Sequence, residues 1–347
     1  MSFHFLLAFS SLAIISSLFL PILVHSDCRR NPVIFNFGDS NSDTGGFAAA
    51  HGFIFGFPMG RNSLHGLADR LCDGRLVIDF LCESLKTPYL PPYLEIVRGN
   101  HVANGANFAI SGSATLPSSN LFNLAVQASQ FVRFQNRSIV SNTRGVPYSL
   151  SVDDFNNALY IFDIGQNDLT ASFSSFSYAQ VIQKIPSSIT EINNTLWLIY
   201  SHGGRNFWIH NTGPLGCLPV QLEGNRANSS DYDKFGCLSS RNEAANIFNN
   251  QLNALCKQLR SQMREARIVY VDMYAIKYDL VASSSTYGIE KPLMACCGDG
   301  GPPYNFNPKV RCSVSLGFDV CEMGSKFVNW DGTHYTEFAN SIIAMKE

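Results

Sequence analysis

A serine and an aspartate–histidine pair, near opposite ends of the sequence, have the residue types needed for nucleophilic acyl transfer. Ser40 follows a short apolar run, residues 33–37, and Asp331 precedes His334 by three positions. On a turn or the first turn of a helix, this spacing lets the aspartate accept a hydrogen bond from the imidazole and fix its tautomer. A serine hydroxyl is a weak nucleophile until such a base takes its proton. Each feature alone is also consistent with a simpler role, Ser40 as a helix N-cap and the pair as a surface contact.

Acyl transfer also requires hydrogen-bond donors directed at the oxygen that becomes negatively charged. The backbone N–H of Ser40 is one candidate, because the residue is expected just past a strand and at the start of a helix. The backbone N–H of Gly112, which ends the segment 107–112, is a second candidate. The side-chain amide of Asn167, in the segment 165–168, is a third. These three groups form the predicted oxyanion hole.

Short apolar runs, predicted as strands, alternate along the chain with longer segments of helical periodicity. Strands of this near-continuous apolar kind are typical of a parallel sheet covered on both faces. Apolar stripes over residues 178–199 and 245–263 predict helices that face the core, and Pro186 predicts a kink or a break in the first of them. The alternation favours a doubly wound α/β sandwich, in which ligands bind at the carboxyl ends of the strands. The predicted strands cover residues 33–37, 159–164, 206–210 and 267–271.

The first 26 residues differ from the rest of the chain. From Phe5 to Val24 the sequence is almost wholly apolar and contains no Lys, Arg, Asp or Glu. This pattern predicts a signal peptide, residues 1–26, cleaved after Ser26 and followed by a single domain over residues 27–347. An uncleaved membrane anchor is the alternative, because the apolar run is nearly long enough to span a bilayer. After the leader, no other stretch is long and apolar enough to predict a membrane anchor.

Cysteines and glycosylation motifs agree with export from the cell. All 10 cysteines follow the predicted cleavage point, an even number that suits an oxidising compartment. Three Asn-x-Ser/Thr triplets, at Asn136, Asn193 and Asn228, are candidate glycosylation sites. The sequence therefore predicts a secreted glycoprotein of the extracellular space or cell wall.

Four cysteines near the end of the chain could be mistaken for a zinc site. Two of them are adjacent, whereas zinc ligands are usually separated by two residues, so disulfide bonds are favoured over a metal. The pairing cannot be deduced from the sequence alone. Cys72 and Cys82 are expected to be either a further pair or two buried free thiols. The four clustered cysteines are Cys296, Cys297, Cys312 and Cys321.

The composition limits the classes of partner. Hydrophobic residues make up 46% of the 347 residues and charged residues 15%, which predicts a well-packed folded protein. The formal net charge is −2, and there is no run of Lys or Arg. Nothing in this charge pattern indicates nucleic-acid binding.

The segment Phe37-Gly38-Asp39-Ser40 resembles the motif after which the GDSL hydrolases, also called SGNH hydrolases, are named. The four sequence blocks of that family carry Ser, Gly, Asn and His, and blocks resembling them stand here in the same order over nearly the whole mature chain. Segments 43–45, 73–75, 213–217 and 328–331 resemble the plant branch in particular. The resemblance assigns the family's functional positions to Ser40, Gly112, Asn167 and His334, with Asp331 completing a triad.

The resemblance implies a three-layer α/β/α, flavodoxin-like fold with a central parallel sheet. It also implies hydrolysis of carboxylic esters through an acyl-serine intermediate, with no metal and no cofactor. The α/β-hydrolases use Gly-x-Ser-x-Gly instead, and residues 38–42 lack the final glycine. Residues 65–72 depart from the pattern of relatives, so the family's substrate preferences are not transferred to this chain.

Three other functions compete with the esterase interpretation. An acyltransferase would use the same residues and pass the acyl group to an alcohol, and sequence does not separate the two. A catalytically silent binding glycoprotein would tolerate loss of Ser40, Asp331 or His334, all of which are present. A glycosidase would use acidic residues near the predicted strand ends, such as Asp39, Asp163 and Asp168. It needs two carboxylates at a defined separation, and the sequence cannot place them. A small-molecule or lipid ester is the expected substrate, and the sequence leaves its acyl chain and the oligomeric state open.

Overall fold

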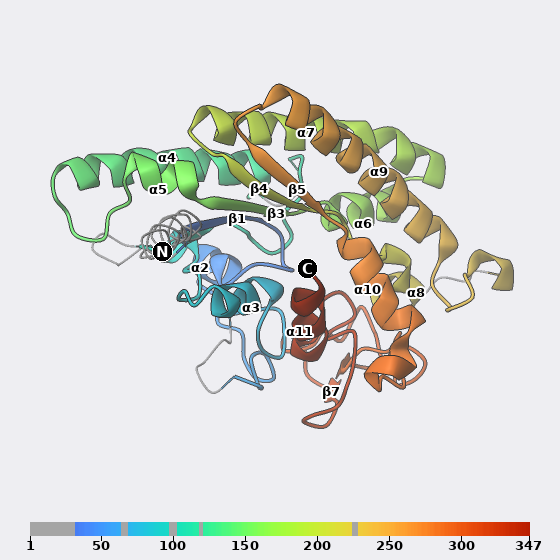
Figure 1. The fold of residues 1–347 in the computed structure, drawn as a ribbon. Helices are drawn as coiled ribbons and strands as arrows, with labels where there is room; N and C mark the ends of the chain where they lie inside the picture. Colours follow the sequence, from blue (N-terminus) through green and yellow to red (C-terminus); the bar gives the residue numbers. More distant parts are fainter. Residues whose placement is uncertain (1–31, 64–68, 97–102, 118–120, 224–227) are drawn as a thin grey trace, which may run out of the picture. The chain divides into compact units, whose positions relative to one another are not determined.

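Five short strands form a parallel sheet in the computed structural model of the chain (Figure 1). The structure describes residues 32–63, 69–96, 103–117, 121–223 and 228–347, so the predicted signal peptide lies outside the described residues. The strand order is β2-β1-β3-β4-β5, and every neighbouring pair is parallel. Flavodoxin-like sheets have this same order. The strands are β1 (Ile34–Gly38), β2 (Gly105–Asn107), β3 (Leu159–Asp163), β4 (Asn206–His210) and β5 (Arg267–Val271).

Helices cover both faces of the sheet. Successive residues of a strand point to opposite faces, and on β1 Phe35 packs against Phe131 with ring centroids 5.2 Å apart, whereas Ile34 lies in a separate cluster with Leu76 and Ile78. Figure 1 shows α4 (Leu124–Thr143), α7 (Tyr178–Ser201) and α9 (Ser239–Gln262) on one side. On the other side are α2 (Gly46–His51), α3 (Val77–Ser84) and α11 (Glu337–Lys346). The predicted α/β fold with a central parallel sheet is confirmed.

Shorter elements connect these layers. They comprise four further α-helices, four 3₁₀ helices and a two-stranded antiparallel sheet of β6 and β7 among the described residues. The helices are α5 (Val152–Asn157), α6 (Gln166–Ser175), α8 (Pro219–Leu222) and α10 (Met273–Ala282). The 3₁₀ helices are η1 (Tyr93–Glu95), η2 (Leu215–Cys217), η3 (Ser229–Asp231) and η4 (Ser284–Tyr287), and the strands are β6 (Cys297–Gly298) and β7 (Asp319–Val320).

The four strands predicted from apolar runs agree with the structure to within one residue at either end. The edge strand β2 has the sequence Gly-Ala-Asn, which carries no apolar run and so gave no signal. Helix α7 runs through Pro186 without a break, contrary to one of the two predicted outcomes. Buried residues on both sides of the proline, Ile185 and Ile192 among them, anchor the helix to the core, and this packing outweighs one lost hydrogen bond.

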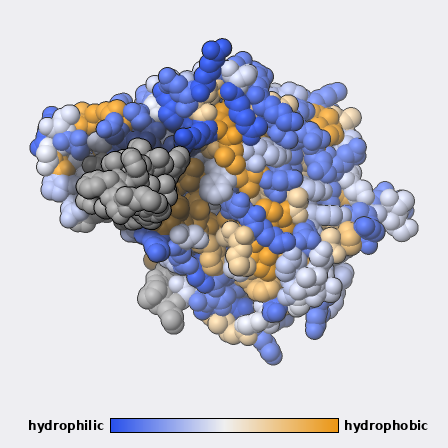
Figure 2. All heavy atoms as spheres, viewed as in Figure 1, coloured by the Kyte–Doolittle hydropathy of each residue, from blue (hydrophilic) through white to orange (hydrophobic). Residues whose placement is uncertain are grey.

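Hydrophobic side chains also reach the surface. Figure 2 shows hydrophobic areas between hydrophilic ones on the face that it presents. Among the described residues, the most exposed examples are Ile54, Phe57, Leu121, Leu316 and Met345, each more than three-quarters exposed. Exposed apolar residues of this kind are common, so they do not by themselves locate a functional site. Within the described ranges, no helix has both the length and the apolar character needed to cross a bilayer.

The carboxyl ends of the central strands bring distant polar residues to one edge of the sheet. In the strand register Gly38 aligns with Asp163, and Asp163 aligns with His210. Strands β1 and β3 are neighbours although β2 lies between them in the sequence, and β2 pairs with the other side of β1. Crevices at such topological switch points are the usual ligand sites of open α/β sheets.

Candidate active site

Ser40 lies in a tight turn that directly follows β1 at the switch point. The turn is closed by hydrogen bonds from the Ser42 N–H to the Asp39 carbonyl (3.2 Å) and from the Asn41 N–H to the Asp39 carboxylate (3.0 Å). Ser40 is 4% exposed. Within the part of the chain that the structure describes, neither its N–H nor its hydroxyl has a hydrogen-bond partner. Both groups therefore remain available to a ligand.

The helix that was predicted to begin at Ser40 begins six residues later, at Gly46. The anion at its first turn is Asp43, whose carboxylate accepts hydrogen bonds from the N–H groups of Gly45 (2.9 Å) and Phe47 (3.1 Å). The same carboxylate accepts from the Ser111 N–H at 2.8 Å. Ser40 is therefore neither a helix N-cap nor a helix-start residue, because the N-cap of α2 is Gly45. The Asp43 carboxylate accepts from the first N–H groups of the helix and ties it to the loop that carries Gly112.

Asn107, at the end of β2, holds the turn of residues 39–43 from the other side. We call this the nucleophile turn, because it carries the predicted nucleophile Ser40. Its side chain is 1% exposed, and its amide donates to the Ser42 carbonyl (2.6 Å) and to the Thr44 hydroxyl (3.0 Å). Its carbonyl oxygen accepts from the Asn36 amide (2.8 Å) and from the Ala109 N–H (3.0 Å). A buried amide with four hydrogen bonds fixes the turn in one conformation.

Asp331 and His334 form a hydrogen-bonded pair in the loop before α11. The Nδ1 atom of His334 lies 2.7 Å from a carboxylate oxygen of Asp331, and the two side chains are 12% and 14% exposed. The other oxygen of Asp331 accepts from the N–H groups of Thr333 (3.0 Å) and His334 (2.9 Å). This arrangement places the proton on Nδ1 and leaves Nε2 as the basic nitrogen.

The charges that act on His334 come from Asp331 and from the nucleophile turn. Burial by itself would lower the pKa of His334, but the charge and hydrogen bond of Asp331 raise it above its ordinary value, with smaller contributions from Asp39 and Asp43. Asp39 directly precedes Ser40, and Asp43 closes the turn. The charges of the turn that carries Ser40 therefore act on the imidazole. Burial works in the opposite sense on Asp331, where His334 and the two backbone N–H groups lower the pKa.

The two other predicted oxyanion donors lie in loops that meet the same turn. Gly112 has a φ of +79°, which glycine adopts without strain, and within the described ranges its N–H has no hydrogen-bond partner. The Asn167 amide, in the first turn of α6, donates to the Ser113 carbonyl at 2.9 Å. It also lies 3.4 Å from the Asp39 carboxylate. Asn167 thus bridges the Gly112 loop and the nucleophile turn, and the long contact to Asp39 leaves one amide hydrogen weakly used.

The carboxylic acid of Asp39, next to Ser40, has an unusually high pKa. It is 1% exposed, and burial, together with the charge of Asp163, raises its pKa to about 7. Its partners are the Asn41 backbone and side chain and the Asn167 amide. Near neutral pH this side chain therefore changes its charge next to Ser40.

Sequence reasoning did not give roles to three residues that support the site. Asp43 and Asn107 are described above. Asp168, after Asn167, accepts from the N–H of Thr115 (3.1 Å) and the hydroxyl of Ser188 (3.1 Å), which fixes the loop after Gly112 to α7. All three stand inside segments that resemble the family's motifs. Their place in these segments could have indicated a supporting role for each residue. Their hydrogen-bond partners could not be predicted, because these come from distant segments.

Disulfide bonds surround the histidine segment. Cys296 pairs with Cys321 and Cys297 pairs with Cys312, as predicted for the clustered cysteines, and Cys217 pairs with Cys237. The N–H groups of Cys296 and Cys297 donate to the carbonyls of Asn329 (3.0 Å) and Trp330 (2.7 Å), directly before Asp331. Of the two outcomes predicted for Cys72 and Cys82, the structure has two buried free thiols.

Comparison with known proteins gives the family. The model of the GDSL-like Lipase/Acylhydrolase family matches residues 34–347. The chain is 52% identical over 329 residues to GDSL esterase/lipase At1g09390 of Arabidopsis thaliana, an alignment that covers 94% of this chain and 88% of that protein. It is 43% identical over 357 residues to a protein of the same plant named Alpha-L-fucosidase 3, with 95% of each chain covered. The chain belongs to the GDSL-like lipase/acylhydrolase family.

A further relative supports assignment to the plant branch of the family. GDSL esterase/lipase LIP-4 of Arabidopsis thaliana is 52% identical over 325 residues, covering 92% of this chain and 86% of that protein. The predicted resemblance to the plant branch of the GDSL hydrolases is thereby confirmed. The protein is a plant-type GDSL esterase/lipase of the SGNH superfamily and a carboxylic ester hydrolase.

Proposed function

We propose that the protein hydrolyses carboxylic esters with Ser40 as nucleophile, His334 as general base and Asp331 as the residue that orients the imidazole. His334 Nε2 takes the Ser40 proton while Oγ attacks the ester carbonyl. The resulting imidazolium is stabilised by Asp331 and then protonates the leaving alcohol. Water attacks the acyl-serine with the same proton transfers and releases the acid. Neither a metal nor a cofactor takes part in this sequence.

The oxyanion of each tetrahedral intermediate is held, in this proposal, by the N–H groups of Ser40 and Gly112 and by the Asn167 amide. Both backbone donors lack partners among the described residues, so they lose no internal hydrogen bond when they turn to the substrate. Donors that are already in place need no rearrangement as charge develops. The observation that carries the proposal is the hydrogen-bonded Asp331–His334 pair beside a turn whose serine is unpartnered.

The decisive experiment measures hydrolysis of nitrophenyl esters from acetate to palmitate by the wild type and by Ser40→Ala. We expect Ser40→Ala to lose the activity. The matched control is Ser42→Ala, because Ser42 is buried two residues away and its hydroxyl has no hydrogen-bond partner in the described structure. Equal activity of Ser40→Ala and the wild type would exclude Ser40 as the nucleophile. The chain-length profile would begin to define the ester substrate, small-molecule or lipid.

An acyltransferase is separated from a hydrolase by the same assay with an added alcohol. A hydrolase releases free acid at a rate that the alcohol changes little, whereas an acyltransferase forms a new ester in place of the acid. If the wild type were inert on every ester and with every alcohol, the silent binding glycoprotein would be favoured instead.

One relative is named a fucosidase, so the glycosidase alternative needs its own test. Two carboxylates flanking a glycosidic bond are required for that chemistry. The Asp39 carboxylate is 1% exposed, and the oxygens of Asp168 are occupied by Thr115 and Ser188. Neither side chain is free to contact a sugar, which favours ester hydrolysis. Release of nitrophenol from nitrophenyl α-L-fucoside by both the wild type and Ser40→Ala would reverse that preference.

We also propose that the chain is secreted after cleavage behind Ser26 and carries N-linked glycans. Asn136 and Asn228 are exposed, and Asn228 lies at a surface turn before η3. Asn193 is partly buried within α7, so it is the least accessible of the three. Mass spectrometry of the protein recovered from a plant culture medium tests both points: the mature N-terminus should be Asp27, and glycan occupancy should be lowest at Asn193.

A further inference from the structure

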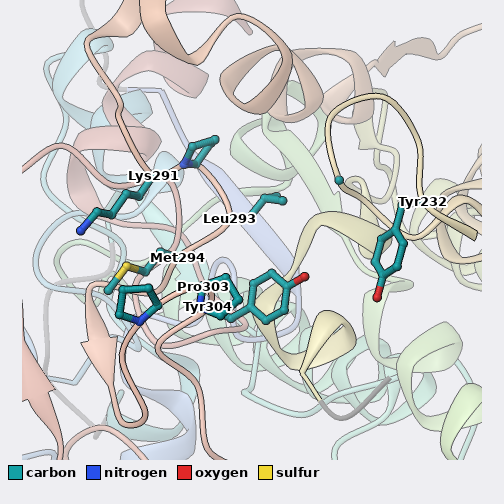
Figure 3. Close-up of a pocket in the computed structure, with 9 residues that line it drawn as sticks. Tyr232, Lys291, Leu293, Met294, Pro303 and Tyr304 are labelled. Carbon is teal, nitrogen blue, oxygen red and sulfur yellow. The ribbon is translucent and has the colours of Figure 1, made fainter. Parts of the chain in front are cut away.

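A second cavity lies outside the catalytic constellation. Its volume is about 450 Å³, and its lining contains none of Ser40, His334, Gly112 and Asn167. It is formed by the loop before α9 and by the loops on either side of Met294 and Tyr304. Figure 3 shows the cavity between Leu293 above and Pro303 and Tyr304 below, with Tyr232 at the far end from Lys291. We call it the proline–tyrosine trough.

The lining of the trough is mainly apolar. Leu293, Met294 and the proline rings supply hydrocarbon surface, and the tyrosines supply ring faces. Of the described residues that line it, only Lys291 is charged. A sugar would need several side-chain donors and acceptors, which this lining does not offer. A hydrocarbon chain fits the chemistry of the walls.

The two ends of the trough differ in charge. Lys291 is exposed at one end. At the other end lies Tyr232. Burial raises the pKa of the Tyr304 phenol in the wall between the two ends, and Tyr232 and the Glu223 carboxylate raise it further. An anionic head group is favoured at Lys291 and disfavoured at the tyrosines. The two ends of the trough therefore differ in how well they accept an anion.

The walls are held in place before any ligand arrives. The Cys217–Cys237 disulfide follows Gly236, and Asp233 accepts hydrogen bonds from the Tyr278 hydroxyl (2.8 Å) and the Cys237 N–H (3.0 Å). On the facing wall the Ala295 N–H donates to the Tyr304 carbonyl at 2.8 Å. A cavity fixed in this way loses little conformational entropy on binding.

We propose that the trough binds an aliphatic carboxylate, with the chain along the apolar walls and the carboxylate at Lys291. Acids of this class are also the products of an ester hydrolase that acts on acyl chains. The site does not depend on the role of Ser40, since the ligand is bound and not transformed there.

The test is calorimetric titration of the protein with hexanoate, octanoate, decanoate and dodecanoate. Affinity should rise about fourfold for each added methylene until the trough is filled, because each buried methylene contributes a similar free energy. Lys291→Met should weaken dodecanoate binding about two- to fivefold, the range for an exposed ion pair, and leave dodecanol binding unchanged. Lys309→Met, at an exposed lysine outside the trough, is the control and should bind as the wild type does.

Binding at the catalytic site is distinguished by repeating the titration after treatment with a nitrophenyl alkylphosphonate, a reagent that labels nucleophilic serines. Dodecanoate should still bind to the labelled protein, and Tyr304→Ala should weaken that binding. Loss of all binding on labelling, or an affinity independent of chain length, would overturn the proposal. Failure of the reagent to label Ser40 would count against the proposed nucleophile and would leave the trough titration as a separate result.

Discussion

The nucleophile turn, residues 39–43, and the histidine segment, residues 330–334, are held in place in different ways. In the histidine segment the bonds to the Asp331 carboxylate come from its own neighbours, Thr333 and His334. The nucleophile turn also has local hydrogen bonds, from the N–H groups of Asn41 and Ser42 to Asp39, but further contacts come from far along the chain. The Ser42 carbonyl is bound by Asn107, and the Asp43 carboxylate is bound by Ser111.

This difference separates two kinds of functional geometry. The Asp331–His334 pair is nearly complete within a short peptide, and the fold has only to deliver it to the right place. The nucleophile turn combines local hydrogen bonds with contacts from distant segments, so its geometry also depends on the packing of β2, α4 and α6 around β1. We therefore expect variants of the first region to change chemistry at constant stability, and variants of the second to change both.

The largest effect is expected from Asp331→Asn. The asparagine amide cannot fix the imidazole with Nε2 unprotonated, so kcat should fall about 10⁴-fold, as in triads of this type. The melting temperature should stay close to that of the wild type, because the segment is also held by the backbone of Cys296 and Cys297. Steady-state kinetics and thermal unfolding measure the two quantities. A large fall in stability would show that the pair is needed for folding and would break the comparison.

The second-largest effect is expected from Asn167→Ala. Loss of one oxyanion donor should lower kcat by about 10²- to 10³-fold, with little change in KM, because the interaction strengthens only in the transition state. Asn41→Ala is the matched control, since this nearby amide bonds to Asp39 in its own turn and to Gln166 at the start of α6 and is not a predicted oxyanion donor. Equal losses in the two variants would argue that Asn167 acts by holding the loops together.

Asn107→Ala tests the dependence of the nucleophile turn on distant residues. Removing a buried amide with four hydrogen bonds should lower the free energy of unfolding by about 2 to 4 kcal/mol. Activity should fall with it, because the Ser42 carbonyl loses its anchor. Denaturant unfolding gives the stability change. Asn142→Ala, at an exposed asparagine whose amide donates to the Ser149 carbonyl, should change the stability little. Undiminished stability of Asn107→Ala would contradict the assigned role.

The smallest effect is a shift in the pH dependence of kcat/KM. The base must be neutral to accept a proton, and the pKa of His334 is raised, so activity should fall as the pH drops through a midpoint above the ordinary value of 6.5. A pH–rate profile on one nitrophenyl ester measures the midpoint. A midpoint at or below 6.5 would show that the Asp331 carboxylate does not outweigh burial.

Asp39→Asn tests whether the acid limb of the pH profile belongs to His334 or to Asp39. The pKa of Asp39 is about 7, and its negative charge helps to raise the pKa of His334. The variant should retain an acid limb, moved to lower pH because one negative charge is gone. Disappearance of the limb would instead assign it to Asp39.

The sequence by itself determined the parts of this protein that depend on neighbours in the chain. Apolar runs predicted four of the five strands of the sheet, because buried strands have a recognisable composition. The spacing of Asp331 and His334 predicted a hydrogen bond that the structure contains. Pairing within a few residues is limited by local geometry, so a pattern of residue types is enough to indicate it.

Only the tertiary structure decided which distant residues meet. The edge strand β2 has no apolar signal, yet its pairing with β1 brings Asn107 to the nucleophile turn. The start of α2 at Gly46 follows from Asp43, whose carboxylate binds Ser111 of a segment 68 residues away. The elevated pKa of Asp39 results from burial beside Asp163 on a neighbouring strand. These features depend on the burial of polar groups among partners that only the folded chain brings together, and no local pattern records them.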